Sequence, residues 1–227
     1  MYFLRFVKGT AYCGSVRTCT PDVRRGRVTM GGVEALGQHR ELVRGCSRCF
    51  PGGGNVPVVD APKNVGVLLV GQAPGLTEVS TRLPFTGPAG RRLEGWLAQT
   101  GVSRGEIYLS ALARCFPGKA RGGGDKVPSR AMLANCRPHL LREFEILRPE
   151  VVVPVGGLAI RELLGIVRLS EAVGETFRRD GVVYVPLPHP SGASTWLNVP
   201  ENKSSFLRAL AVLGGLVAAG RIEGSGA

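Results

Sequence analysis

Four short apolar runs, each followed by a segment with helical periodicity, most constrain what this chain can fold into. The runs are VGVLLVG at 65–71, EIYLSALA at 106–113, EVVVPVG at 150–156 and GVVYVPLPHP at 181–190. Strands that are apolar on both faces are typical of a parallel sheet covered by helices on both sides. We therefore expect an α/β class, single-domain three-layer fold, with a central four-stranded parallel sheet flanked by helices.

The intervening segments predict the helices and the boundaries of the domain. We expect helices at about 33–44, 89–99, 129–147, 157–165 and 201–216, and Ser129 as the N-cap of the third. The glycine-rich stretch FPGKARGGGDKVP has no periodicity and predicts a mobile surface loop. Residues 30–218 are expected to form the domain. Residues 1–29 are interpreted as a basic extension, either disordered or upstream of a true start at Met30, and residues 219–227 as a flexible tail.

An excess of positive charge indicates the kind of partner. Lys and Arg number 29 against 17 Asp and Glu, which gives a formal net charge of +12. This excess favours a polyanionic partner such as nucleic acid, and a basic protein without such a partner is the alternative. We find no stretch long and apolar enough to span a membrane and no convincing export signal, so we expect a cytoplasmic monomer without membrane contact.

The ends of the predicted strands carry polar and glycine-rich segments, namely GQAPG, SALARC, PVGG and PLPHPSG. In parallel α/β sheets, ligands bind beyond the carboxyl ends of the strands. Gln72, Ala111 and His189 are therefore expected to converge on one crevice. His189 lies between two prolines and is followed by Ser191, which favours a functional role over that of a hydrogen-bonded structural histidine.

Four of the six cysteines have the spacing of a metal-ligand set. Cys46 and Cys49 form a C-x2-C pair, Cys115 ends a predicted strand and Cys136 lies early in a predicted helix. Four thiolates suit either zinc or an iron–sulfur cluster, and spacing alone does not choose between them. A disulfide framework is the weaker interpretation for a basic chain without an export signal. The two cysteines before residue 30 stay unassigned.

Taken in order, these motifs resemble the uracil-DNA glycosylase superfamily, in particular its iron–sulfur branches, families four and five. The stretch GQAPGLTEVSTRLPFTGPAG at 71–90 is similar to the uracil-pocket motif of family four, and PHPS at 188–191 is similar to its second pocket motif. The resemblance covers about residues 33–216. It implies a [4Fe-4S] cluster, rather than zinc, on Cys46, Cys49, Cys115 and Cys136.

The resemblance also implies an activity, base-excision repair of DNA. Such an enzyme flips uracil out of the helix and hydrolyses its N-glycosidic bond, leaving an abasic site. His189 would stabilise the departing uracil anion, and Gln72 would orient a water or the base. Phe85 would stack on the flipped base, unless it is a core residue. The remaining substrate-binding candidates are Ala73, Glu78, Ala111 and Ser191.

Several of these candidates have alternative interpretations. Glu78 could contact the uracil edge, fix its loop or be a solvated loop residue. The DNA-binding candidates are Lys119, Arg121, Ser194 and Trp196, because they lie in basic or loop segments that follow predicted strands. Trp196 could instead pack beneath the last helix.

Departures from the family pattern affect the predicted chemistry. Family four has Glu where this chain has Gln72 and Asn where it has Ala111, and the acidic residue of family five is replaced by Pro88. Gln72 cannot serve as a general base. Because Ala111 lacks an amide that would read the base, we expect activity on other deaminated bases such as hypoxanthine or xanthine.

Two other function classes remain as alternatives. One is a protein that binds uracil-containing or damaged DNA without turnover, carrying the same cluster. The other is a generic nucleotide or phosphate binder. That class predicts a glycine-rich loop that runs directly into a helix, whereas the segment containing STRLPF is expected to separate GQAPG from the helix at about 89.

Overall fold

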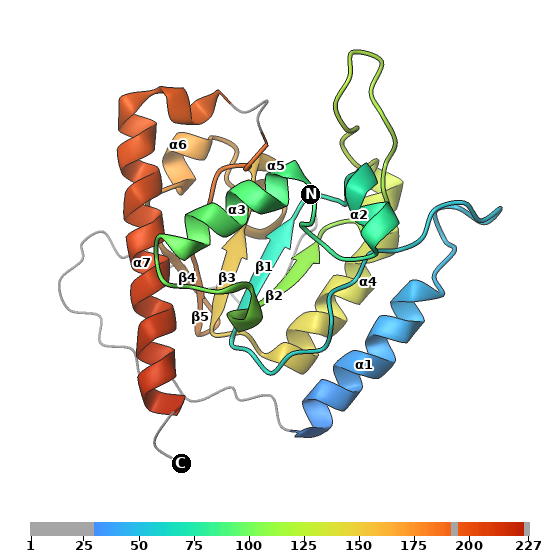
Figure 1. Ribbon diagram of the computed structural model, residues 1–227, viewed down its shortest axis with the longest axis horizontal. Coiled ribbons are helices and arrows are strands. Elements are labelled where there is room, and N and C mark those ends of the chain that lie inside the picture. The colour runs from blue at the N-terminus through green and yellow to red at the C-terminus, as the bar shows by residue number, and fades with distance from the viewer. Residues whose placement is uncertain (1–29, 192–194, 225–227) are drawn as a thin grey trace.

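The computed structural model describes residues 30–191 and 195–224, and it contains a five-stranded sheet between two layers of helices (Figure 1). The strand order is β2-β1-β3-β5-β4. Four strands run parallel, namely β1 (Val67–Gly71), β2 (Ile107–Ala111), β3 (Val151–Pro154) and β5 (Val182–Tyr184). The predicted α/β fold and its four parallel strands are confirmed.

A fifth strand, β4 (Phe177–Arg179), pairs antiparallel with β5 at one edge of the sheet. Sequence reasoning missed this strand because it is only three residues long and two of them are exposed arginines. A strand of this kind lacks the apolar run that identified the other four.

The helices in the described residues are α1 (Met30–Arg44), α2 (Leu76–Thr81), α3 (Pro88–Ala98), α4 (Arg130–Leu147), α5 (Gly157–Leu164), α6 (Leu169–Ala172) and α7 (Pro200–Gly224), with short 3-10 turns at η1 (Arg104–Glu106) and η2 (Trp196–Asn198). Five of the helices, α1, α3, α4, α5 and α7, begin close to their predicted positions. Ser129 caps α4 as expected, because its hydroxyl accepts a hydrogen bond from the N–H of Met132 at 3.2 Å. The last helix extends to Gly224, well past the expected end near Leu216.

The short helix α2 overturns one argument made from the sequence. It begins at Leu76, directly after the GQAPG segment, with Gly75 as its N-cap. The expectation that no helix directly follows this glycine-rich turn was therefore wrong. The turn thus gives no ground for excluding a nucleotide binder. Neither α2 nor α6 was predicted, since helices of six and four residues are too short to show a clear periodicity.

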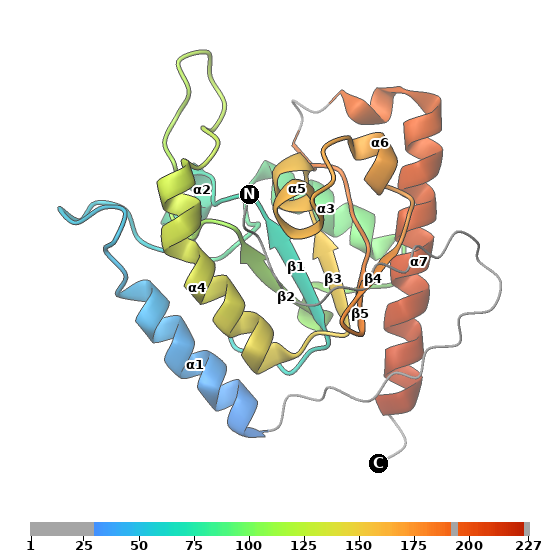
Figure 2. The ribbon, with the colours of Figure 1, turned by 180° about the vertical axis from the view of Figure 1, so that it is seen from behind.

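The two faces of the sheet bury separate apolar clusters. On one face, Leu69 and its neighbours contact α3 and α7, including Trp96 and Leu213. On the other face, Leu68 and its neighbours contact α1, α4 and α5, and Figure 2 shows these helices in front of the sheet. The alternation of Leu68 and Leu69 between faces follows from the two-residue period of a strand.

Helix α7 tests the expectation that the chain has no segment able to span a membrane. Residues 200–220 are long and apolar enough, by length and composition alone, to cross a membrane, contrary to what we expected from the sequence. The face of this helix that carries Phe206, Leu210 and Leu213 is buried against the sheet. That packing accounts for part of its apolar composition, because 28% of the apolar window is buried in the fold.

The glycine-rich segment expected to be a mobile loop forms a hairpin-like loop outside the named strands, hereafter the glycine arm (residues 117–126). Its two sides join through an antiparallel bridge between Lys119 and Asp125. Two backbone bonds reinforce it, from Ala120 N to Gly124 O at 3.2 Å and from Lys126 N to Gly118 O at 2.9 Å. The arm projects beyond the carboxyl ends of the strands, next to α2 (Figure 1).

Candidate active site

A cleft of about 800 Å³ opens beyond the carboxyl ends of the parallel strands. The register places Gly71 beside Ala111 and Val70 beside Pro154, so the first three strands end at the same level. The cleft is lined by eight of the residues singled out from the sequence, namely Gln72, Ala73, Glu78, Phe85, Ala111, Lys119, His189 and Ser191. The structure therefore brings together the three strand-end residues that we expected to converge.

The ring of Phe85 lies directly on the backbone at the end of β1. A Cβ atom added at Gly71 would be only 2.6 Å from Cζ of Phe85, so a side chain at position 71 would displace the ring. Phe85 has φ of 54°, in the left-handed region that costs energy for a bulky residue. Its ring packs partly against the core cluster and also lines the cleft. Phe85 is therefore both a core residue and a cleft residue, which were the two alternatives drawn from the sequence.

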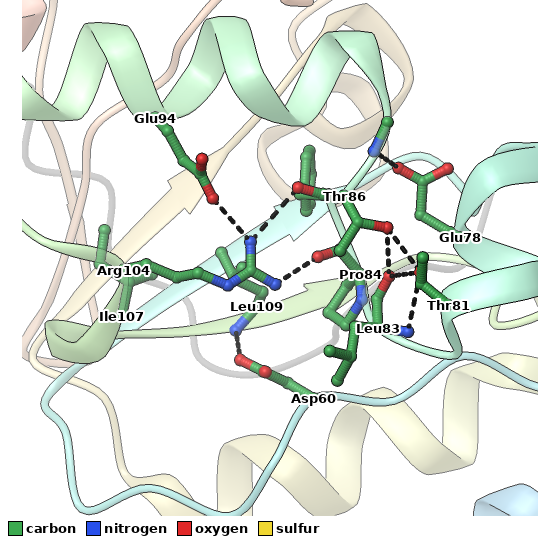
Figure 3. A network of polar contacts seen from close by, with 12 residues as sticks. Asp60, Glu78, Thr81, Leu83, Pro84, Thr86, Glu94, Arg104, Ile107 and Leu109 are labelled. Carbon is green, nitrogen blue, oxygen red and sulfur yellow. Dashed lines mark hydrogen bonds and ion pairs between the residues drawn. The ribbon is translucent and has the colours of Figure 1, made fainter.

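Arg104 in η1 holds the backbone of the segment that carries Phe85. Its guanidinium donates to the carbonyl oxygens of Pro84 at 2.5 Å and Phe85 at 3.3 Å, and it forms an ion pair with Glu94 at 3.2 Å (Figure 3). Gly90 permits this arrangement, because a Cβ at that position would clash with the Phe85 carbonyl. The Arg104 contacts fix an otherwise unfavourable backbone conformation.

Glu78 closes the loop between the first strand and α3. Its side chain is buried, at 8% exposure, and its two oxygens accept the N–H groups of Gly75 at 3.0 Å and Gly87 at 2.7 Å. Figure 3 shows the second of these bonds. Of the interpretations made from the sequence, this geometry favours the one in which Glu78 fixes its loop, since both oxygens are already used.

His189 is held in one tautomer by its own loop. The backbone N–H of Ser191 donates to Nδ1 at 3.1 Å, so in the neutral ring the proton resides on Nε2. Burial lowers the pKa of His189, and the charge of Asp125 opposes this effect. A neutral imidazole with Nε2–H as a donor therefore faces the cleft.

Two neighbours position the His189 ring. Gly156 follows β3 with φ of 89°, and a Cβ added there would be 3.0 Å from Cδ2 of His189. On α3, Arg92 donates to the carbonyl of Ser191 at 3.2 Å. The His189 ring therefore packs against the end of β3, and its loop is hydrogen-bonded to α3, the helix that follows Phe85.

A buried ion pair forms the floor of the cleft. Arg114 and Glu143 are 2% and 1% exposed and lie 2.5 Å apart. Glu143 also accepts from the hydroxyls of Ser110 at 2.8 Å and Tyr108 at 3.3 Å, and Arg114 donates to the carbonyl of Ala111. Burial raises the pKa of Glu143, and the guanidinium opposes that shift.

The four candidate metal ligands come from three separated segments. Cys46 and Cys49 follow α1, Cys115 follows β2, and Cys136 lies in the second turn of α4. Burial, together with the charges of the other three cysteines, raises the pKa of Cys115 to about 12. The four thiols therefore lie within electrostatic range of one another, although no group of three or more His, Cys, Asp or Glu within the described ranges has the geometry to hold a metal ion.

The remaining DNA-binding candidates lie away from the cleft or outside the described residues. Arg121 is exposed on the glycine arm and is not part of the cleft lining. Trp196 packs against the core cluster beside α7, as the alternative interpretation held. Ser194 falls in the segment 192–194, outside the described residues.

Three residues of the site were not found from the sequence. They are Arg104, Arg114 and Asp125, which lines the cleft from the glycine arm. Their roles depend on contacts with segments far away in the sequence. The only signal for Asp125 was its place in the loop between Cys115 and Cys136.

Comparison with known proteins gives a consistent set of relatives. A family model described as the uracil DNA glycosylase superfamily matches residues 58–213. A type-4 uracil-DNA glycosylase of Pyrobaculum aerophilum is 30% identical over 147 residues, which cover 60% of this chain and 68% of the relative. The type-4 enzyme of Thermotoga maritima is 31% identical over 122 residues, covering 53% and 61%. A type-5 enzyme of Pyrobaculum aerophilum is 33% identical over 94 residues, covering 40% and 39%.

Proposed function

The chain belongs to the uracil-DNA glycosylase superfamily, and from this premise we propose that it is a uracil-DNA glycosylase of DNA repair. In this proposal it flips uracil out of DNA and hydrolyses the N-glycosidic bond, leaving an abasic site. One observation carries the proposal beyond the family: the ring of Phe85 and the neutral imidazole of His189 line the same cleft.

Phe85 supplies the surface on which the flipped base stacks. Extruding a base from the helix costs a few kcal/mol, which contacts in the cleft must offset. An aromatic face stacked on a base contributes about 1 to 3 kcal/mol. Because Arg104 holds the backbone of Pro84 and Phe85, the ring needs little reorganisation when the base enters.

His189 stabilises the leaving group. As the bond from C1′ of the sugar to N1 of uracil breaks, the electron pair moves onto the uracil ring and negative charge grows on its O2. A neutral Nε2–H donates to that oxygen without any change of protonation state. Removal of one such preorganised donor typically costs about 2.7 to 4 kcal/mol.

Other residues of the cleft take supporting roles in this proposal. Gln72 orients the water or the base, and the backbone near Ala73 offers N–H groups to the base. Ser191 keeps the His189 tautomer through its own N–H. Ala111 leaves the floor of the cleft without a side-chain amide, so we propose that hypoxanthine or xanthine is accepted besides uracil.

We propose a [4Fe-4S] cluster on Cys46, Cys49, Cys115 and Cys136, with zinc as the less favoured occupant. Four thiolates are the ligand set of such a cluster. The other three cysteines act on Cys115 electrostatically, which agrees with one group held by all four. When bound, the cluster would hold the end of α1 against β2 and α4 without taking part in the reaction.

Positive side chains around the cleft would hold the DNA backbone. Lys119 and Arg121 lie on the glycine arm, and Ser194 and Trp196 belong to the segment after His189. Of these, Trp196 has the weakest support, because its ring packs against the core. Contacts with phosphates would make binding fall steeply with salt concentration.

The decisive experiment uses a labelled oligonucleotide with one uracil, treated with the purified protein and then with alkali. We expect strand scission at the uracil position, and a loss of about 100-fold or more for His189→Ala. His139→Ala is the matched control, because that histidine lies between α1 and α4. Binding of the oligonucleotide without scission would instead support the non-catalytic binding protein.

A further inference from the structure

Three carboxylates line the cleft within the described residues, and in two of them both oxygens are already bonded to the protein. Both oxygens of Glu78 accept backbone N–H groups. Glu143 lies under the floor, where Arg114 and two hydroxyls surround it. Asp125, which projects from the glycine arm, is the third.

Two features place Asp125 at the mouth of the cleft. One oxygen, Oδ1, accepts a hydrogen bond from Nζ of Lys119 at 2.7 Å across the arm. The Asp125 side chain is 38% exposed to solvent. The other oxygen, Oδ2, lies only 3.0 Å from where a Cβ of Gly75 would be. The lack of a side chain at position 75 thus lets the carboxylate approach the segment that carries Gln72.

The carboxylate of Asp125 also faces the functional histidine. Its charge raises the pKa of His189 against the lowering that burial causes, so the two groups lie within electrostatic range across the cleft. A base held between them would have the imidazole donor on one side and a negative charge on the other. A carboxylate on that side of the base would stabilise a positive sugar ring and accept a proton from an attacking water.

We propose that Asp125 is a catalytic residue, the carboxylate that takes a proton from the attacking water and faces the positively charged sugar. This inference rests on the proposed glycosylase activity. It assigns to the glycine arm the function that Gln72 cannot perform, because an amide does not accept a proton at neutral pH.

The bond between C1′ and N1 breaks, and its electron pair leaves with uracil as an anion that the Nε2–H of His189 stabilises. The water oxygen forms a bond to C1′, and one water proton moves to the Asp125 carboxylate. That proton passes to solvent, and the uracil anion takes up a proton from solvent after release.

The test measures single-turnover cleavage of a uracil oligonucleotide by wild type, Asp125→Asn, Asp125→Ala and Asp125→Glu. Asparagine keeps the shape of the side chain, and the exposed arm is not part of the core, so the variants should fold. The matched control is Asp180→Asn, in the turn before β5 at the opposite end of the strands. Asp180 has φ of 50°, a conformation that asparagine also adopts.

We expect Asp125→Asn to cleave about 100-fold or more slowly, as general-base catalysis contributes on the order of 10² to 10⁴. Its affinity for DNA should stay within about threefold, because a repulsive charge rather than a phosphate contact is removed. Formate added to Asp125→Ala and the longer carboxylate of Asp125→Glu should each restore part of the rate, which a purely structural role would not produce.

The outcomes separate this inference from the proposed function. If wild type and Asp125→Asn cleave at similar rates, Asp125 is not the base, although the glycosylase assignment stands. If Asp125→Asn is slow and neither formate nor glutamate restores any rate, the carboxylate does not act on the water. If wild type itself does not cleave uracil-DNA, the proposed function fails, and the inference fails with it.

Discussion

Replacing Glu78 by glutamine tests whether this side chain fixes the loop or takes part in the reaction. Glutamine has one oxygen where glutamate has two, so one of the two backbone N–H groups would face an amide NH₂ group. An unsatisfied buried donor costs about 1 to 3 kcal/mol, and the surviving bond loses about 1 kcal/mol because it is no longer charge-assisted. The free energy of unfolding should therefore fall by about 2 to 4 kcal/mol.

Urea unfolding followed by far-UV circular dichroism measures this change. The matched control is Glu171→Gln, because that glutamate is exposed and pairs only with Arg168 on the surface, where such a pair contributes about 0.5 kcal/mol. The glycosylase rate of Glu78→Gln should fall as well, since the loop that carries Phe85 is released. An unchanged unfolding free energy with a lost rate would refute the reasoning, because it would place Glu78 in the chemistry.

Three further predictions follow from contacts within the fold. Gly71→Ala should raise KM for uracil oligonucleotides, because the added methyl group displaces the Phe85 ring at a cost of about 1 to 3 kcal/mol; an unchanged KM would contradict this. Glu143→Gln should lower the unfolding free energy by about 3 to 5 kcal/mol, since it leaves the buried charge of Arg114 unpaired. The readout is the urea midpoint of unfolding. A midpoint that barely moves would show that the pair is unimportant. Burial lowers the pKa of His39 from 6.5 to about 4, so the unfolded chain takes up a proton that the fold does not, and stability should fall as pH falls from about 6.5 to 4. His39→Gln should flatten this dependence in a pH series of unfolding curves.

The parts of the fold that were predictable are those encoded in short stretches of sequence. The apolar runs identified four parallel strands, and their common direction placed Gln72 and His189 at one edge. The cap at Ser129 was recognisable because capping depends on neighbours three residues away. Properties that depend on local spacing could therefore be inferred without coordinates.

The parts that were missed depend on contacts between distant segments. Arg104 reaches back to the carbonyls of residues 84 and 85, and Asp125 gains its place only because the arm folds over Gly75. The orientation of Glu78 also required coordinates, since a glutamate in a glycine-rich loop is equally compatible with solvent exposure. No local pattern records where a loop returns to the body of the protein.

Arg114 connects two parts of the molecule that have been described separately. Its N–H donates to Sγ of Cys136 at 3.3 Å, while its guanidinium supports the Ala111 carbonyl beneath the cleft. The cysteine segment of α4 and the end of β2 below the cleft are therefore joined through one buried side chain, so a displacement of the Cys136 sulfur would reach the floor of the cleft through Arg114.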